Sequence, residues 1–73
     1  MNLQLENILK EILRILHQEL NLNQQEALGV IVPFKTEKQA QTMLYYLLEN
    51  KDNKELMRVD KLLKVRAKIA EEN

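Results

Sequence analysis

Cysteine, serine and tryptophan are absent from this 73-residue chain, and glycine and proline occur once each, at Gly29 and Pro33. The absence of cysteine excludes disulfides and thiolate metal sites. His17 is the one histidine, and it cannot anchor a zinc ion without several carboxylates around it. A single glycine cannot build a loop that cradles phosphates. We therefore expect no metal and no cofactor.

The chain also lacks a charge excess and a long hydrophobic run. Eleven basic and eleven acidic side chains cancel, so no global charge draws the chain to nucleic acid or to a membrane surface. The longest run without charged or amide side chains, residues 27–34, is too short to span a bilayer. The first residues do not resemble a secretory signal. These features favour a cytoplasmic protein without a membrane partner.

The length predicts a single helical domain over residues 1–73, near the lower limit for folding alone. Chains of this size bury only about 60% of the surface that the unfolded chain exposes. Such small domains usually depend on a disulfide, a metal or oligomerisation. Because the composition argues against a disulfide and a metal site, oligomerisation is the remaining way to stabilise the fold.

The residues 2–20 predict a helix with an unusually broad apolar face. At about 100° per residue, its bulky aliphatic side chains fall within an arc of roughly 160°, interrupted by Glu19. A helix packed on one side needs an apolar stripe of only about 100°, so this helix requires covering from two directions. The resulting candidate oligomer interface consists of Leu5, Ile8, Leu9, Ile12, Leu13, Ile15, Leu16 and Leu20. Ile8, Ile12 and Ile15 form one seam and the leucines from Leu9 to Leu20 the other, and the sequence leaves open which seam faces the partner.

An apolar link around residues 22–34 follows. Asn23 and Glu26 have the spacing of a capping box, which predicts a short turn of helix ending at Gly29. Val30 to Val32 are β-branched, and Val32 precedes a proline, which biases it toward extended geometry. An apolar connector is the favoured interpretation of these three residues, and a short edge strand is the alternative.

Two further helices are predicted over residues 37–49 and 53–70. Thr36 with Gln39 forms one capping-box pattern, and Asp52 with Glu55 forms another. A tight turn between the two helices predicts an antiparallel hairpin. The expected fold is therefore all-α, a small three-helix domain.

The sequence offers little for catalysis. Serine and cysteine nucleophiles are missing, and the acidic residues show no metal-ligand spacing with a histidine. We interpret His17 as a solvated surface residue on the polar side of the helix 2–20. We therefore predict that the protein is not an enzyme.

One charged feature stands above the background, a basic stripe on the helix 53–70. The stretch 54–68 holds six basic and two acidic residues, and five of the basic residues fall within roughly 120° of arc. These candidate anion-binding or partner-binding residues are Lys54, Arg58, Lys61, Lys64 and Lys68. A plain solvated face is the favoured interpretation, with an acidic protein surface or a nucleic-acid backbone as the alternatives.

These patterns predict a non-enzymatic helical protein–protein interaction module that self-associates through its first helix, most simply as a homodimer. One alternative is a small nucleic-acid-binding regulator that uses the basic stripe. The other is an adaptor or inhibitor that binds a different protein. No feature of the sequence alone separates self-association from binding to another protein.

Overall fold

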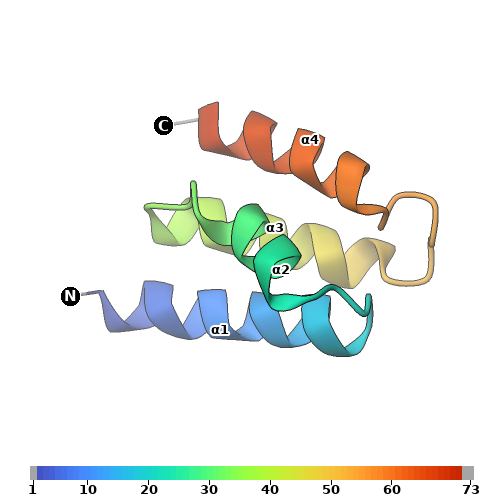
Figure 1. Cartoon of the computed structure of the whole chain (residues 1–73). Coiled ribbons are helices and arrows are strands. Elements are labelled where there is room, and N and C mark those ends of the chain that lie inside the picture. Colours follow the sequence, from blue (N-terminus) through green and yellow to red (C-terminus); the bar gives the residue numbers. More distant parts are fainter. Residues whose placement is uncertain (1, 72–73) are drawn as a thin grey trace.

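The computed structural model describes residues 2–71, and this part of the chain forms four helices without a strand (Figure 1). The helices are α1 (Leu3–Gln18), α2 (Gln24–Ile31), α3 (Glu37–Asn50) and α4 (Val59–Glu71). The predicted all-α class is confirmed. The predicted count of three helices is wrong, because the link 22–34 contains a helix of its own.

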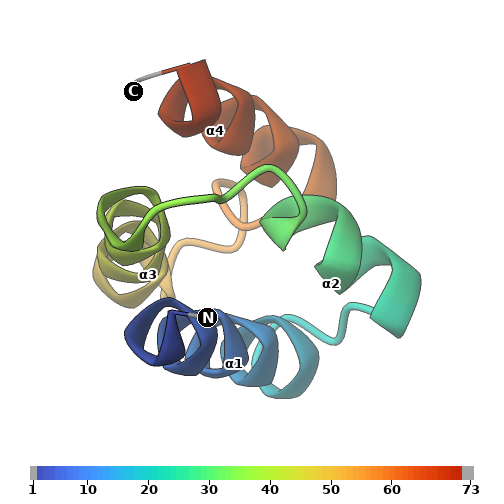
Figure 2. The same cartoon turned by 90° about the vertical axis from the view of Figure 1, so that its left-hand side faces the viewer.

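The helices surround a central core. α1 and α3 run in the same direction, α4 returns antiparallel to α3, and α2 lies obliquely between the end of α1 and the start of α3 (Figure 1). Seen along the bundle, α1 and α4 occupy opposite sides, with α2 and α3 between them (Figure 2). α1 and α4 each pack against both α2 and α3. The apolar faces of α1 and α4 therefore pack mainly against the intervening helices.

Asparagines define both ends of α1. The side chain of Asn2 accepts a hydrogen bond from the backbone N–H of Leu5 at 3.1 Å, which satisfies one of the free donors of the first turn. At the other end, Asn21 has a φ of 58°, in the left-handed region that asparagine tolerates. The backbone N–H of Leu22 then donates to the carbonyl of Leu16 at 3.0 Å. This turn ends α1 at Gln18, two residues before the predicted boundary.

α2 begins as predicted and ends later. The Asn23–Glu26 capping box is confirmed, with the Glu26 N–H donating to Asn23 Oδ1 at 2.8 Å. The predicted end at Gly29 is wrong, because that residue has no positive φ and the helix continues to Ile31. Residues 30–32 form neither an edge strand nor a continuous connector, because Val30 and Ile31 are helical and buried and Val32 is the exposed C-cap of α2. Burial in the core outweighs the weak local preference of β-branched residues for extended structure.

α3 begins at the predicted capping box, but α4 begins later than predicted. The Gln39 N–H donates to Thr36 Oγ1, and the Thr36 N–H donates to Gln39 Oε1, each at 3.2 Å. The connection 51–58 replaces the predicted tight turn, and the predicted start at residue 53 is wrong. Asn53, not Asp52, caps a single turn by accepting from the Leu56 N–H at 3.3 Å. Met57 is buried in the core, so the connection closes one end of the bundle.

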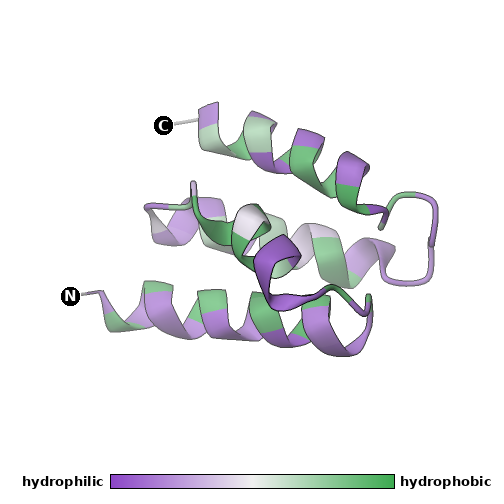
Figure 3. Cartoon of the chain, in the orientation of Figure 1, coloured by the Kyte–Doolittle hydropathy of each residue, from purple (hydrophilic) through white to green (hydrophobic). Residues whose placement is uncertain are grey.

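The core lies at the centre of the four helices. In Figure 3, hydrophobic residues of α1 and α4 face the rest of the bundle, while their outer edges are hydrophilic. The completely buried large side chains are Ile12, Ile15, Leu16, Val30, Met43, Leu47 and Leu62. Within residues 2–71, no helix has the length and apolarity needed to cross a bilayer.

Candidate binding groove between α1 and α2

The broad apolar face of α1 is divided between core and surface. Ile12, Ile15 and Leu16 are completely covered by the chain itself and offer no surface to a partner. The remaining members of the predicted interface are partly buried at the edges of the core, and they are Leu5, Ile8, Leu9, Leu13 and Leu20. α3 covers α1 on one side and α2 covers it on the other. Part of the surface predicted to contact a second copy is therefore covered by α2 and α3 of the same chain.

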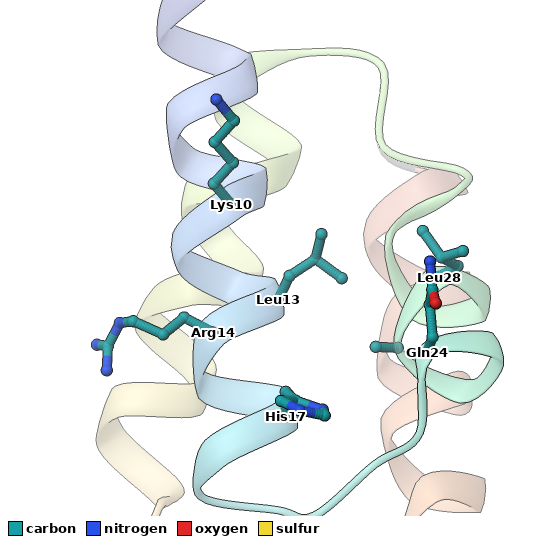
Figure 4. A pocket seen from close by; sticks show the side chains of 7 residues that line it. Lys10, Leu13, Arg14, His17, Gln24 and Leu28 are labelled. Atoms are coloured by element: carbon teal, nitrogen blue, oxygen red, sulfur yellow. The ribbon is translucent and has the colours of Figure 1, made fainter.

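An open groove of about 410 Å³ lies where α1 and α2 meet. Its lining residues are Lys10, Leu13, Arg14, His17, Gln24, Ala27 and Leu28. Ala27 is buried, whereas Leu28 is 39% exposed. Figure 4 shows Leu13 pointing from α1 toward α2, where Leu28 lies. The groove therefore combines an apolar floor with accessible leucine side chains.

The two cationic side chains that line the groove, Arg14 and Lys10, differ in their ion pairing. Arg14 is held by Glu11, with Nη2 and Oε1 2.5 Å apart, and Arg14 Nη1 also donates to Gln18 Oε1 at 3.3 Å. Hydrogen bonding to Arg14 lowers the pKa of the Glu11 carboxyl below its ordinary value. The Arg14 side chain points away from α2 (Figure 4). Lys10 has no ion pair among residues 2–71, so it supplies the uncompensated positive charge at this rim.

His17 lies at one end of the groove and is exposed. Its Nδ1 is 3.1 Å from the carbonyl oxygen of Leu22. Because a carbonyl oxygen only accepts, Nδ1 carries the hydrogen in this contact. The bond fixes the ring against the turn that follows α1, with the ring directed toward Gln24 (Figure 4). Among the described residues, no group of three His, Cys, Asp or Glu side chains is arranged to hold a metal ion.

The structure does not place the five residues of the predicted basic stripe on one helix. Lys61, Lys64 and Lys68 lie on α4, but Lys54 and Arg58 precede it in the connection 51–58. Their assignment to a continuous helix is therefore wrong, because the chain breaks before Val59. Arg58 Nε lies 3.7 Å from Asp60 Oδ1, and Lys61 Nζ lies 3.8 Å from Glu55 Oε1. These carboxylates offset part of the positive charge.

A second, smaller hollow of about 330 Å³ lies at the end of the bundle closed by the connection 51–58. Its lining residues are Glu19, Leu20, Leu22, Lys54, Met57, Arg58 and Val59. Leu20 of the predicted interface is thus separated from the α1–α2 groove. Acidic and basic side chains both line this hollow. It therefore favours a charged partner of one sign less than the α1–α2 groove does.

Comparisons with family models, with curated proteins and with solved structures found no match to this chain. The functional proposal therefore rests on the chemistry of the groove itself. Lys10, Gln24, Ala27 and Leu28 are not among the predicted site residues. Prediction of α2 as a full helix places Gln24, Ala27 and Leu28 on one face, because they are spaced three and four positions apart after the Asn23 cap.

Proposed function

We propose that this protein is a non-enzymatic helical module that binds an amphipathic helix of another protein in the groove between α1 and α2. The observation that carries the proposal is the pair Leu13 and Leu28, which face an open apolar hollow from two helices anchored in the core. Amphipathic helices commonly bind by placing apolar residues in such a groove. The volume of about 410 Å³ has room for one or two bulky side chains.

Binding to another protein is better supported than self-association at this groove. A two-fold dimer brings the same patch of both subunits together, and the described lining of this patch holds no carboxylate that could pair with the Lys10 of the other copy. A partner that supplies such a carboxylate is therefore favoured over a second copy. Self-association through the first helix stays a prediction, now confined to the partly buried edge residues such as Leu9 and Leu13.

A selection of helical peptides tests this function without assuming the partner. A displayed library of amphipathic helices is selected on the wild-type protein and then screened against Leu28→Glu. Because Leu28 is 39% exposed, this variant is expected to fold, which circular dichroism checks. The proposal expects binders whose affinity for Leu28→Glu falls at least about tenfold, since a charge replaces an apolar contact. Failure to recover binders, or binders that ignore the substitution, would contradict the proposal.

Tyr45→Glu is the matched control for an added charge on exposed apolar surface. Tyr45 is 57% exposed on α3 and does not line the α1–α2 groove. Peptides that bind the groove should bind this variant and the wild type equally. Equal loss of binding in both variants would indicate a general effect of surface charge and would count against the groove.

A further inference from the structure

We infer that the helix bound by this groove is acidic, with a carboxylate beside its apolar residues that pairs with Lys10. This inference rests on the proposed function and specifies the class of partner. Among residues 2–71, the ionisable side chains that line the groove are Lys10, Arg14 and His17, and no carboxylate lines it. The groove therefore favours a partner that carries negative charge.

No carboxylate of residues 2–71 forms an ion pair with Lys10, including Glu6, which lies one helical turn before it on α1. Glu11 holds Arg14 through two hydrogen bonds at 2.5 and 3.2 Å. Glu26 Oε1 accepts from the backbone N–H of Asn23 at 3.1 Å within the capping box of α2. Neither side chain pairs with Lys10. The ammonium group of Lys10 is thus available to a carboxylate that arrives with the partner.

The positions along α1 indicate where that carboxylate lies. Lys10 and His17 line the groove seven positions apart, with Leu13 between them. At 1.5 Å per residue this separation is about 10 Å, or two helical turns. A partner helix lying along α1 can place apolar residues against Leu13 and Leu28 and a carboxylate one turn away, at Lys10. Covering the groove also removes water from this pair, which strengthens the attraction.

Three synthetic helical peptides test the inference by fluorescence anisotropy. They share the apolar residues of a groove binder and carry glutamate, glutamine or lysine at the flanking positions. The wild-type protein is expected to bind the glutamate peptide about three- to tenfold more tightly than the lysine peptide, a range typical of partly exposed charge pairs. Added salt should reduce this difference, because it screens charges near the surface.

Charge reversal at one lysine provides the decisive comparison. Lys10→Glu should invert the order of the peptides and favour the lysine peptide. Lys64→Glu is the matched control, because it changes the net charge of the protein equally on exposed surface of α4. This control should preserve the preference for glutamate, and circular dichroism verifies that both variants are folded.

The outcomes separate this inference from the function on which it rests. Equal affinity of the three peptides, with loss of binding in Leu28→Glu, would overturn the acidic partner and leave the groove function intact. A reversal caused equally by Lys64→Glu would also overturn it, because long-range charge would then explain the preference. No binding of any peptide would contradict the groove function itself. Dimerisation of the protein that the peptides reverse would identify a second copy as the occupant and overturn the inference.

Discussion

The guanidinium group of Arg66 donates a hydrogen bond to the carbonyl oxygen of Gly29 and so joins α4 to the last turn of α2. In a continuing helix this carbonyl would accept from the N–H four residues later, but that residue is Pro33, which has no N–H. Arg66 replaces the missing donor from a different helix. The arginine that interrupts the apolar face of α4 therefore caps α2.

This relationship predicts coupling between Arg66 and Pro33. Arg66→Met keeps an apolar stem but leaves the Gly29 carbonyl without its donor, and should lower the free energy of unfolding by about 1–3 kcal/mol. Pro33→Ala restores a backbone N–H at the position where it can serve the same carbonyl. Arg66→Met should therefore cost less in the Pro33→Ala background. A double-mutant cycle measured by urea unfolding checks this, and strictly additive effects would contradict the capping role.

Gly29→Ala is expected to stabilise the protein. Gly29 lies within α2, its φ is not positive, and an added Cβ would meet no atom within 4 Å. Alanine is favoured over glycine in a helix interior by about 0.5–1 kcal/mol, largely because it restricts the unfolded chain. Thermal unfolding should show a higher midpoint for this variant. A lower midpoint would mean that α2 requires the backbone conformational freedom of glycine at position 29.

Two leucines of α1 should differ sharply in their contribution to stability. Leu16 is completely buried and Leu3 is 66% exposed. Leu16→Ala should cost about 2–5 kcal/mol because it removes core contacts and leaves a cavity, a large part of the stability of a small domain. Leu3→Ala should change the free energy of unfolding by less than about 0.5 kcal/mol. Similar losses in the two variants would show that α1 does not use its Leu16 face for the core.

Gln39 of α3 has a buried polar side chain, and its amide should contribute measurably to stability. Its Oε1 accepts from the N–H groups of Lys35 at 2.8 Å and Thr36 at 3.2 Å, and its Nε2 donates to the carbonyl of Ala70 at 3.5 Å. Gln39→Ala leaves these groups without their partner and should cost about 1–3 kcal/mol. Gln41→Ala, at an exposed position of the same helix, is the control and should have almost no effect in chemical unfolding. Equal effects would contradict the role assigned to the amide.

Local signals in the sequence predict the helix starts that carry a capping box better than the boundaries that packing determines. The capping boxes at Asn23 and Thr36 depend on residues three positions apart, so they are visible without the fold. The end of α2 and the start of α4 depend on distant packing. Val30 remains helical because it is buried, Arg66 supplies a cap from another helix, and Met57 holds the connection 51–58 against the core.

The candidate groove was predictable only in part for the same reason. The breadth of the α1 face correctly indicates covering from two directions, but periodicity does not identify the second cover. α2 supplies it, and the contact between α1 and α2 brings Leu13 near Leu28, although 15 positions separate them in the sequence. The charge of the groove depends on ion pairs as well as on residue type, because Glu11 offsets Arg14 and leaves Lys10 without a partner.

The most direct test of the central proposal is a titration of isotope-labelled protein with the glutamate peptide, followed by amide chemical shifts. Binding in the groove predicts the largest shifts at Lys10, Leu13, His17, Gln24 and Leu28, with the α3 residues Tyr45 and Leu48 unchanged. Shifts centred on α3 or α4, or none at saturating peptide concentration, would contradict the account.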